Sequence, residues 1–152
     1  MGVNRNSLVF HLVHTVATTT LALAIVPVAF AGKGGGHHGG GGTTSGGGSL
    51  TLSMVVDNNR NGLPNWGDTI TFKVSTTATT EPHVNVTCYQ GGVAVYGAAT
   101  GYYASYPWPW TQNMSLSSQS WTGAPADCTA VLQAYSGTSV STLATLNFHV
   151  DA

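Results

Sequence analysis

Charged side chains are scarce in this sequence. Only 6% of its 152 residues are Lys, Arg, Asp or Glu, whereas an ordinary soluble domain contains roughly 25%. The basic residues are spread over the whole chain, at Arg5, Lys33, Arg60 and Lys73. Because binding to phosphates through charge requires a clustered basic face, the composition excludes nucleic acid as a partner.

The acidic residues are scattered in the same way. They are Asp57, Asp68, Glu81, Asp127 and Asp151. Acid–base and metal-assisted catalysis require carboxylates, His or Cys that converge on one place. The sequence therefore predicts a protein that is not an enzyme. It also predicts a folded protein, because 42% of the residues are hydrophobic and can form a core.

Residues 1–31 have the pattern of a secretory signal peptide. A polar start containing Arg5 is followed by an apolar run from Val16 to Ala29 and by the small residues around a cleavage site after Ala31. A membrane-spanning helix needs roughly 20 apolar residues, and this run is shorter. We therefore expect a secreted, extracellular protein with no stable membrane span in its mature form. An uncleaved membrane anchor is the alternative.

The next segment, residues 32–49, is predicted to be a flexible linker. Eleven of its eighteen residues are Gly and none is apolar, so burial cannot offset the entropy lost on ordering. The remaining residues, 50–152, are then one domain of the size of a small β-sandwich.

Hydrophobic residues alternate with polar ones along this domain, which is the period of half-buried strands. The alternation is clearest over 50–56, 70–74 and 84–88, and further strands are predicted over 93–98, 112–116, 127–135 and 142–150. Seven short strands separated by turn signals predict an all-β fold, an immunoglobulin-like antiparallel β-sandwich.

Cysteine is also scarce, with Cys88 and Cys128 as the only two. Both occupy the inward face of a predicted strand in a chain addressed to an oxidising compartment, so we predict a disulfide between them. By strand count they lie on the third and sixth strands, which are neighbours within one sheet. Antibody domains instead bridge their two sheets.

The segment 57–68, DNNRNGLPNWGD, has oxygen-bearing side chains at the spacing of calcium loops. Asp57, Asn59, Asn61 and Asp68 occupy the first, third, fifth and twelfth positions, and Gly62 the sixth. No cofactor other than calcium is suggested by the sequence. The alternative is a polar turn in which the Asn and Asp side chains accept hydrogen bonds from their own backbone.

The same segment, extended to DNNRNGLPNWGDTITF over 57–72, resembles the opening of immunoglobulin-like repeats in bacterial secreted and cell-surface proteins. The later ADCTAVL, 126–132, is similar to the strand that carries the second Cys in many such domains. The resemblance implies an extracellular β-sandwich used for adhesion, spacing or display, without catalysis.

Aromatic residues are concentrated in one short stretch. They are Tyr102, Tyr103, Tyr106, Trp108 and Trp110. Pro107 and Pro109 favour an extended, polyproline-like backbone that would hold the two Trp rings apart from the core. Rigid exposed rings can stack on sugars, whereas buried rings would cover an edge of the core.

These observations support three functions. The first is a secreted, non-catalytic interaction module for a surface or matrix, acting in adhesion or display on an extracellular glycan or protein partner. The second is a carbohydrate-binding module that uses the aromatic stretch. The third is a calcium-stabilised structural domain that self-assembles through strand edges.

Overall fold

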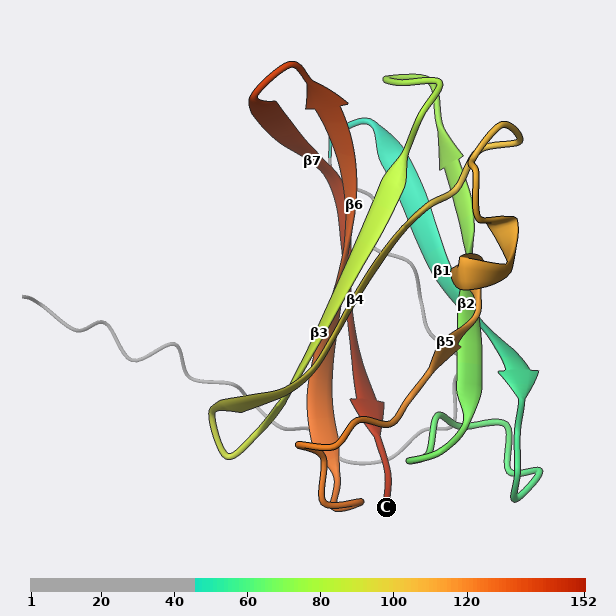
Figure 1. Ribbon diagram of the computed structural model, residues 1–152, viewed down its shortest axis with the longest axis vertical. Coiled ribbons are helices and arrows are strands. Elements are labelled where there is room, and N and C mark those ends of the chain that lie inside the picture. The colour runs from blue at the N-terminus through green and yellow to red at the C-terminus, as the bar shows by residue number, and fades with distance from the viewer. Residues whose placement is uncertain (1–45) are drawn as a thin grey trace, which may run out of the picture. The chain divides into compact units, whose positions relative to one another are not determined.

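The computed structural model describes residues 46–152, which fold as two antiparallel β-sheets packed face to face (Figure 1). The predicted signal peptide and residues 32–45 of the predicted linker lie outside the described residues. The strands are β1 (Gly48–Val56), β2 (Thr69–Thr76), β3 (His83–Gln90), β4 (Val93–Gly101), β5 (Met114–Ser115), β6 (Ala126–Ser136) and β7 (Ser139–Val150). A short 3-10 helix, η1 (Pro109–Gln112), precedes β5.

One sheet has the strand order β1-β2-β5 and the other the order β4-β3-β6-β7. The chain passes from one sheet to the other between β2 and β3, between β4 and β5 and between β5 and β6. This arrangement confirms the immunoglobulin-like sandwich of seven strands that the sequence predicts.

The alternation of hydrophobic and polar residues along the strands determines which side chains form the core. Side chains at alternate positions of each strand point between the sheets and are buried, among them Leu50, Ile70, Phe72, Val84, Val86, Leu132 and Leu146. The β1–β2 pairing begins at Gly48 and Thr76, so β1 includes the last two residues of the predicted linker. A side chain at Gly48 would lie 2.8 Å from the Leu132 methyl group, and glycine therefore allows this close approach.

The predicted disulfide between Cys88 and Cys128 is confirmed. The two residues are direct cross-strand partners in β3 and β6, with 4.0 Å between their Cα atoms, and both are buried. The bond therefore joins neighbours within one sheet, as the strand count predicts. Since it closes a loop across 40 positions, it should stabilise the fold by about 4 kcal/mol through the entropy of the unfolded chain.

The predicted and observed strands differ most in the segment between β4 and β6. The strand predicted over 112–116 is reduced to Met114–Ser115, because Gln112 ends η1 and Leu116 turns inward to donate its backbone N–H to the carbonyl of Asp68 at 2.7 Å. No helix in residues 46–152 is long and apolar enough to cross a membrane.

Candidate ligand-binding surface

The five aromatic candidates lie on the segment that crosses from β4 to β5, residues 102–113, here called the crossover segment (Figure 1). The structure divides them into three environments. Trp108 and Trp110 are exposed, Tyr103 and Tyr106 join a ring cluster on the four-stranded sheet, and Tyr102 packs at the edge of the core.

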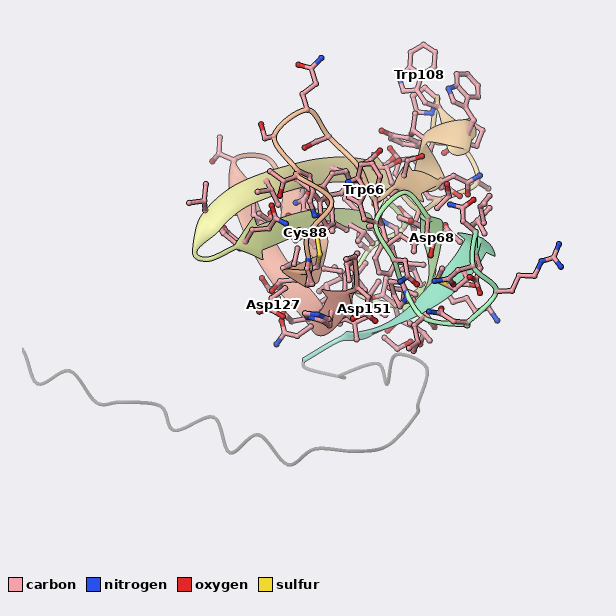
Figure 2. All side chains as sticks on the ribbon, turned by 90° about the horizontal axis from the view of Figure 1, so that it is seen from below. Trp66, Asp68, Cys88, Trp108, Asp127 and Asp151 are labelled. Carbon is pink, nitrogen blue, oxygen red and sulfur yellow. A yellow bond between two sulfur atoms is a disulfide. The ribbon has the colours of Figure 1, made fainter. Side chains whose placement is uncertain are left out.

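Trp108 and Trp110 form an exposed pair, here called the Trp pair. Their side chains are 54% and 67% exposed, and the ring centroids lie 5.4 Å apart at an interplanar angle of 67°. Figure 2 shows Trp108 projecting outward from the body of the sandwich. The two rings are therefore exposed and do not cover the core, whereas their use as a platform for a ligand stays a prediction.

The backbone that carries the Trp pair is not extended. Pro109 begins η1, and the Thr111 backbone N–H and hydroxyl both donate to the Trp108 carbonyl, at 2.9 and 2.7 Å. Proline is favoured at the first position of a helix because its missing N–H would have no partner there. The predicted polyproline-like conformation is thus replaced by a helical turn at Pro109.

Hydrogen bonds fix the crossover segment to both sheets. The Gln112 side-chain amide donates to the Gly101 carbonyl at 2.9 Å, and the Gln112 carbonyl accepts from the Thr71 and Tyr102 hydroxyls at 2.9 and 3.0 Å. The Thr111 hydroxyl lies 2.9 Å from that of Thr100. The segment that carries the Trp pair is consequently fixed to both sheets.

Tyr102 helps to fix the crossover segment to the sandwich and does not belong to the exposed surface. Its ring packs edge-on against Phe72, with 6.3 Å between the centroids. Burial raises the pKa of Tyr102 above its ordinary value, and hydrogen bonds with the Thr71 side chain and the Phe72 backbone oppose this shift. Burial likewise raises the pKa of Tyr96, and the charge of Tyr102 adds to the effect. For Tyr102, the alternative of a ring that covers the core edge is the better description.

Tyr103 and Tyr106 belong to a second aromatic group that includes two residues from the strands. The His83 ring on β3 makes edge-to-face contacts with Tyr103, Tyr106 and Tyr135, at centroid distances of 5.5, 6.1 and 4.9 Å. Gly101 is required here because a Cβ atom would lie 2.7 Å from the Tyr103 ring. Desolvation, and then the charges of Glu81 and Tyr106, raise the pKa of Tyr103.

This ring cluster borders a groove of about 360 Å³ on the outer face of the four-stranded sheet. Its lining residues are His83, Asn85, Ala99, Thr100, Tyr106 and Tyr135. Sequence reasoning finds only Tyr106 among them. The others come from strands that are distant in sequence and become neighbours through pairing, as when Asn85 lies opposite Ala99 on one side and Val131 on the other.

Other aromatic and polar residues lie away from this surface. Trp121 is 3% exposed, its indole N–H donates to the Ala124 carbonyl at 2.9 Å, and its ring packs on Tyr96. His149 is bound to Asp127 at 2.8 Å and lies 3.7 Å from Asp151. Asp127 is paired with Tyr89 in the β3–β6 ladder, and His83 is paired with Gln133. His149 and His83 are therefore at opposite ends of the sheet.

In the loop between β1 and β2, the predicted calcium ligands hold the backbone in place. Asp57 accepts the backbone N–H groups of Gly62 and Asn61 at 2.8 and 3.3 Å, Asn59 also accepts from Asn61, and the Asn61 side chain accepts from Leu63 at 2.7 Å. These bonds are those of the alternative polar turn. Calcium binding at Asp57, Asn59, Asn61 and Asp68 stays a prediction.

Asp68 is fully buried, unlike the other three predicted ligands (Figure 2). One of its carboxylate oxygens accepts the Asn58 N–H at 2.9 Å and the other accepts the Asn65 N–H at 3.0 Å. Asp68 thus ties the two halves of the loop together. Within residues 46–152, no three His, Cys, Asp or Glu side chains gather into a group that could hold a metal ion.

Comparison of the sequence with protein-family models and with curated proteins, and of the fold with solved structures, finds no match.

Proposed function

We propose that this protein is a secreted, non-catalytic interaction module that attaches to an extracellular surface or matrix. The observation that carries the proposal is the exposed Trp pair, held by η1 and by the hydrogen bonds of the crossover segment. Exposed Trp residues are enriched among the residues that dominate binding energy at interfaces. A fixed pair also loses little conformational entropy when a ligand binds.

A glycan is the second candidate ligand class, beside a protein. Sugar rings present apolar CH faces that stack on indole and phenol rings, and the Trp pair offers two such rings to solvent. The disulfide supports secretion, because such bonds persist in oxidising compartments. The adhesion or display role implied by the bacterial immunoglobulin-like repeats agrees with both ligand classes.

A matrix-retention assay tests the proposal. The secreted protein is incubated with insoluble peptidoglycan, cellulose, chitin and collagen, and the bound fraction is measured. We expect retention on at least one matrix and a decrease of about tenfold or more for the double variant Trp108→Ala/Trp110→Ala. Failure of the unmodified protein to bind any matrix would overturn the proposal, as would equal retention of the double variant.

The matched control is Trp66→Ala. Trp66 is also exposed, by 44%, but it lies on the β1–β2 loop against Gly123. Its replacement should leave retention unchanged, which separates the Trp pair from a general effect of exposed indole rings. Mass spectrometry of the secreted protein tests the predicted signal peptide. Cleavage after Ala31 gives an N-terminus at Gly32, and an intact Met1 would contradict the prediction.

A further inference from the structure

The groove is lined by residues of three paired strands and by Tyr106 of the crossover segment. The strand residues are His83, Asn85, Ala99, Thr100 and Tyr135, of which Thr100 is buried. Ala99 contributes only a methyl group to this lining, whereas Tyr106 and Tyr135 contribute aromatic rings. The result is a shallow hollow with aromatic walls. It is separate from the Trp pair, although Tyr106 belongs to the same crossover segment.

A small polar network lies beside the aromatic walls. The Asn85 amide donates to the Gln133 side-chain oxygen and to the Tyr135 hydroxyl, the latter at 3.3 Å, and the Tyr135 hydroxyl donates to the same Gln133 oxygen at 3.0 Å. These bonds orient all three side chains. Asn85 and Tyr135 line the groove. Because the Asn85 amide nitrogen donates to its two neighbours, the amide oxygen is left as an acceptor.

The charge of the groove restricts its ligand. None of the lining residues is Asp, Glu, Lys or Arg, so a charged ligand would lose water without gaining an opposite charge. The volume is at the lower end of the range of about 300–1,000 Å³ that is typical of small-molecule sites. The lining combines aromatic rings with the oriented amide of Asn85 and lacks Asp, Glu, Lys and Arg. This combination matches one neutral pyranose ring, with its CH face and its hydroxyl groups.

We propose that this groove binds one uncharged pyranose residue of a glycan. The inference rests on the proposed function and deepens it, because it names the ligand class and a second contact site. The rings of Tyr106 and Tyr135 stack against the sugar, while the Asn85 oxygen accepts from a sugar hydroxyl. Gln133 holds the Asn85 and Tyr135 side chains in position through its hydrogen bonds.

Isothermal titration calorimetry tests this assignment with neutral cello-, xylo-, manno- and chito-oligosaccharides and with charged oligogalacturonate. We expect at least one neutral probe to bind and the charged probe not to bind. Asn85→Ala and Tyr135→Ala should each weaken the neutral probe by about tenfold, because each removes either a fixed hydrogen-bonding group or a stacking ring.

Tyr89→Ala is the matched control for Tyr135→Ala. Both are Tyr residues of the four-stranded sheet, exposed by 45% and 47%, but Tyr89 lies at the other end of β3. Tyr89→Ala should leave binding of the neutral probe unchanged. Circular dichroism melting of each variant shows whether the fold is retained.

The outcomes distinguish this inference from the proposed function. Matrix retention that depends on the Trp pair, with no neutral probe binding or with binding unaffected by Asn85→Ala and Tyr135→Ala, would overturn the groove assignment alone. Preference for the charged probe would also overturn it. Equal matrix retention of the unmodified protein and of Trp108→Ala/Trp110→Ala, together with groove-dependent binding of a neutral probe, would support the groove and overturn the role of the Trp pair.

Discussion

At the scale of single residues, a side chain's structural role depends on what it accepts or donates and not on its type. Asp57 and Asp68 both look like calcium ligands in the sequence, yet Asp57 is at the surface and Asp68 is completely buried. Asp68 accepts two backbone N–H groups that have no other partner in the loop. Its carboxylate is therefore a structural element of the β1–β2 loop.

Asp68→Ala should lower the free energy of unfolding by about 2–4 kcal/mol, because one buried and one partly buried N–H group lose their carboxylate acceptor. Asp57→Ala is the matched control. Its N–H partners are exposed and can bond to water, so the loss should stay below about 1 kcal/mol. Urea unfolding of both variants measures the difference, and equal losses would contradict the role assigned to Asp68.

We expect the free energy of unfolding to decrease in alkaline solution because of Tyr96 and Tyr102. Burial raises the pKa of both phenols in the folded state, so the unfolded chain ionises first, near its ordinary pKa of about 10. The full stability is present below that pH and decreases as the pH rises above it. Denaturant unfolding at about pH 8 and pH 11 should show the decrease, and Tyr102→Phe should make it smaller. A pH-independent free energy would contradict this prediction.

At the scale of elements, the strands were predictable and the crossover segment was not. Alternation of Ile70, Phe72 and Val74 against polar residues identifies β2 without reference to the rest of the chain. Residues 102–113 have no such period, and their conformation depends on hydrogen bonds to Gly101 and Thr71 that belong to other elements. The extended backbone expected for alternate Pro residues is therefore replaced by a helical turn, which accommodates Pro109 at its first position and is fixed by hydrogen bonds to neighbouring elements.

The groove could not be predicted from local sequence either, because it depends on strand pairing. His83 and Tyr135 become neighbours only because β3 and β6 pair in the register that places His83 opposite Gln133. The pairing follows from the disulfide position, since Cys88 lies opposite Cys128 in the same ladder. Counting back from Cys88 and forward from Cys128, one residue at a time, would have placed Asn85 opposite Val131 and His83 opposite Gln133, on the face of the sheet away from the two Cys residues.

The β1–β2 loop gives a test of the calcium hypothesis. Its side-chain oxygens at Asp57, Asn59 and Asn61 already accept backbone N–H groups, so we expect the loop to be stable without an ion. The melting temperature should be the same in EDTA and in millimolar calcium. If calcium does bind, a concentration of ten times Kd would add about 1.4 kcal/mol. A rise of several degrees would then be measured and would support the calcium site.

At the scale of the whole molecule, the low charge limits what can drive binding. Residues 46–152 contain only Arg60 and Lys73 against five acidic side chains, a net charge near −3 with His neutral. Neither basic residue lies in the groove or in the crossover segment. Contacts through exposed rings and neutral hydrogen-bonding groups are therefore the main attraction available to this surface.

Matrix retention should accordingly change little with ionic strength. Screening weakens charge-driven association as the Debye length shortens from about 10 Å at 0.1 M salt to about 3 Å at 1 M, but it leaves ring stacking almost unaffected. Retention measured over this range of sodium chloride is expected to vary by less than about twofold. A tenfold decrease would show that charge, not the aromatic surface, controls attachment.

The position of the disulfide has a mechanical consequence. Residues 89–127 lie inside the loop that the Cys88–Cys128 bond closes, and this loop contains η1 and both rings of the Trp pair. Tension between the two ends of the chain passes from Cys88 directly to Cys128, so the enclosed residues carry no load. In single-molecule stretching, the oxidised protein should lengthen by about 130 Å less than the reduced one. The segment proposed to attach the protein would thus be shielded from the pull that unravels the strands on either side.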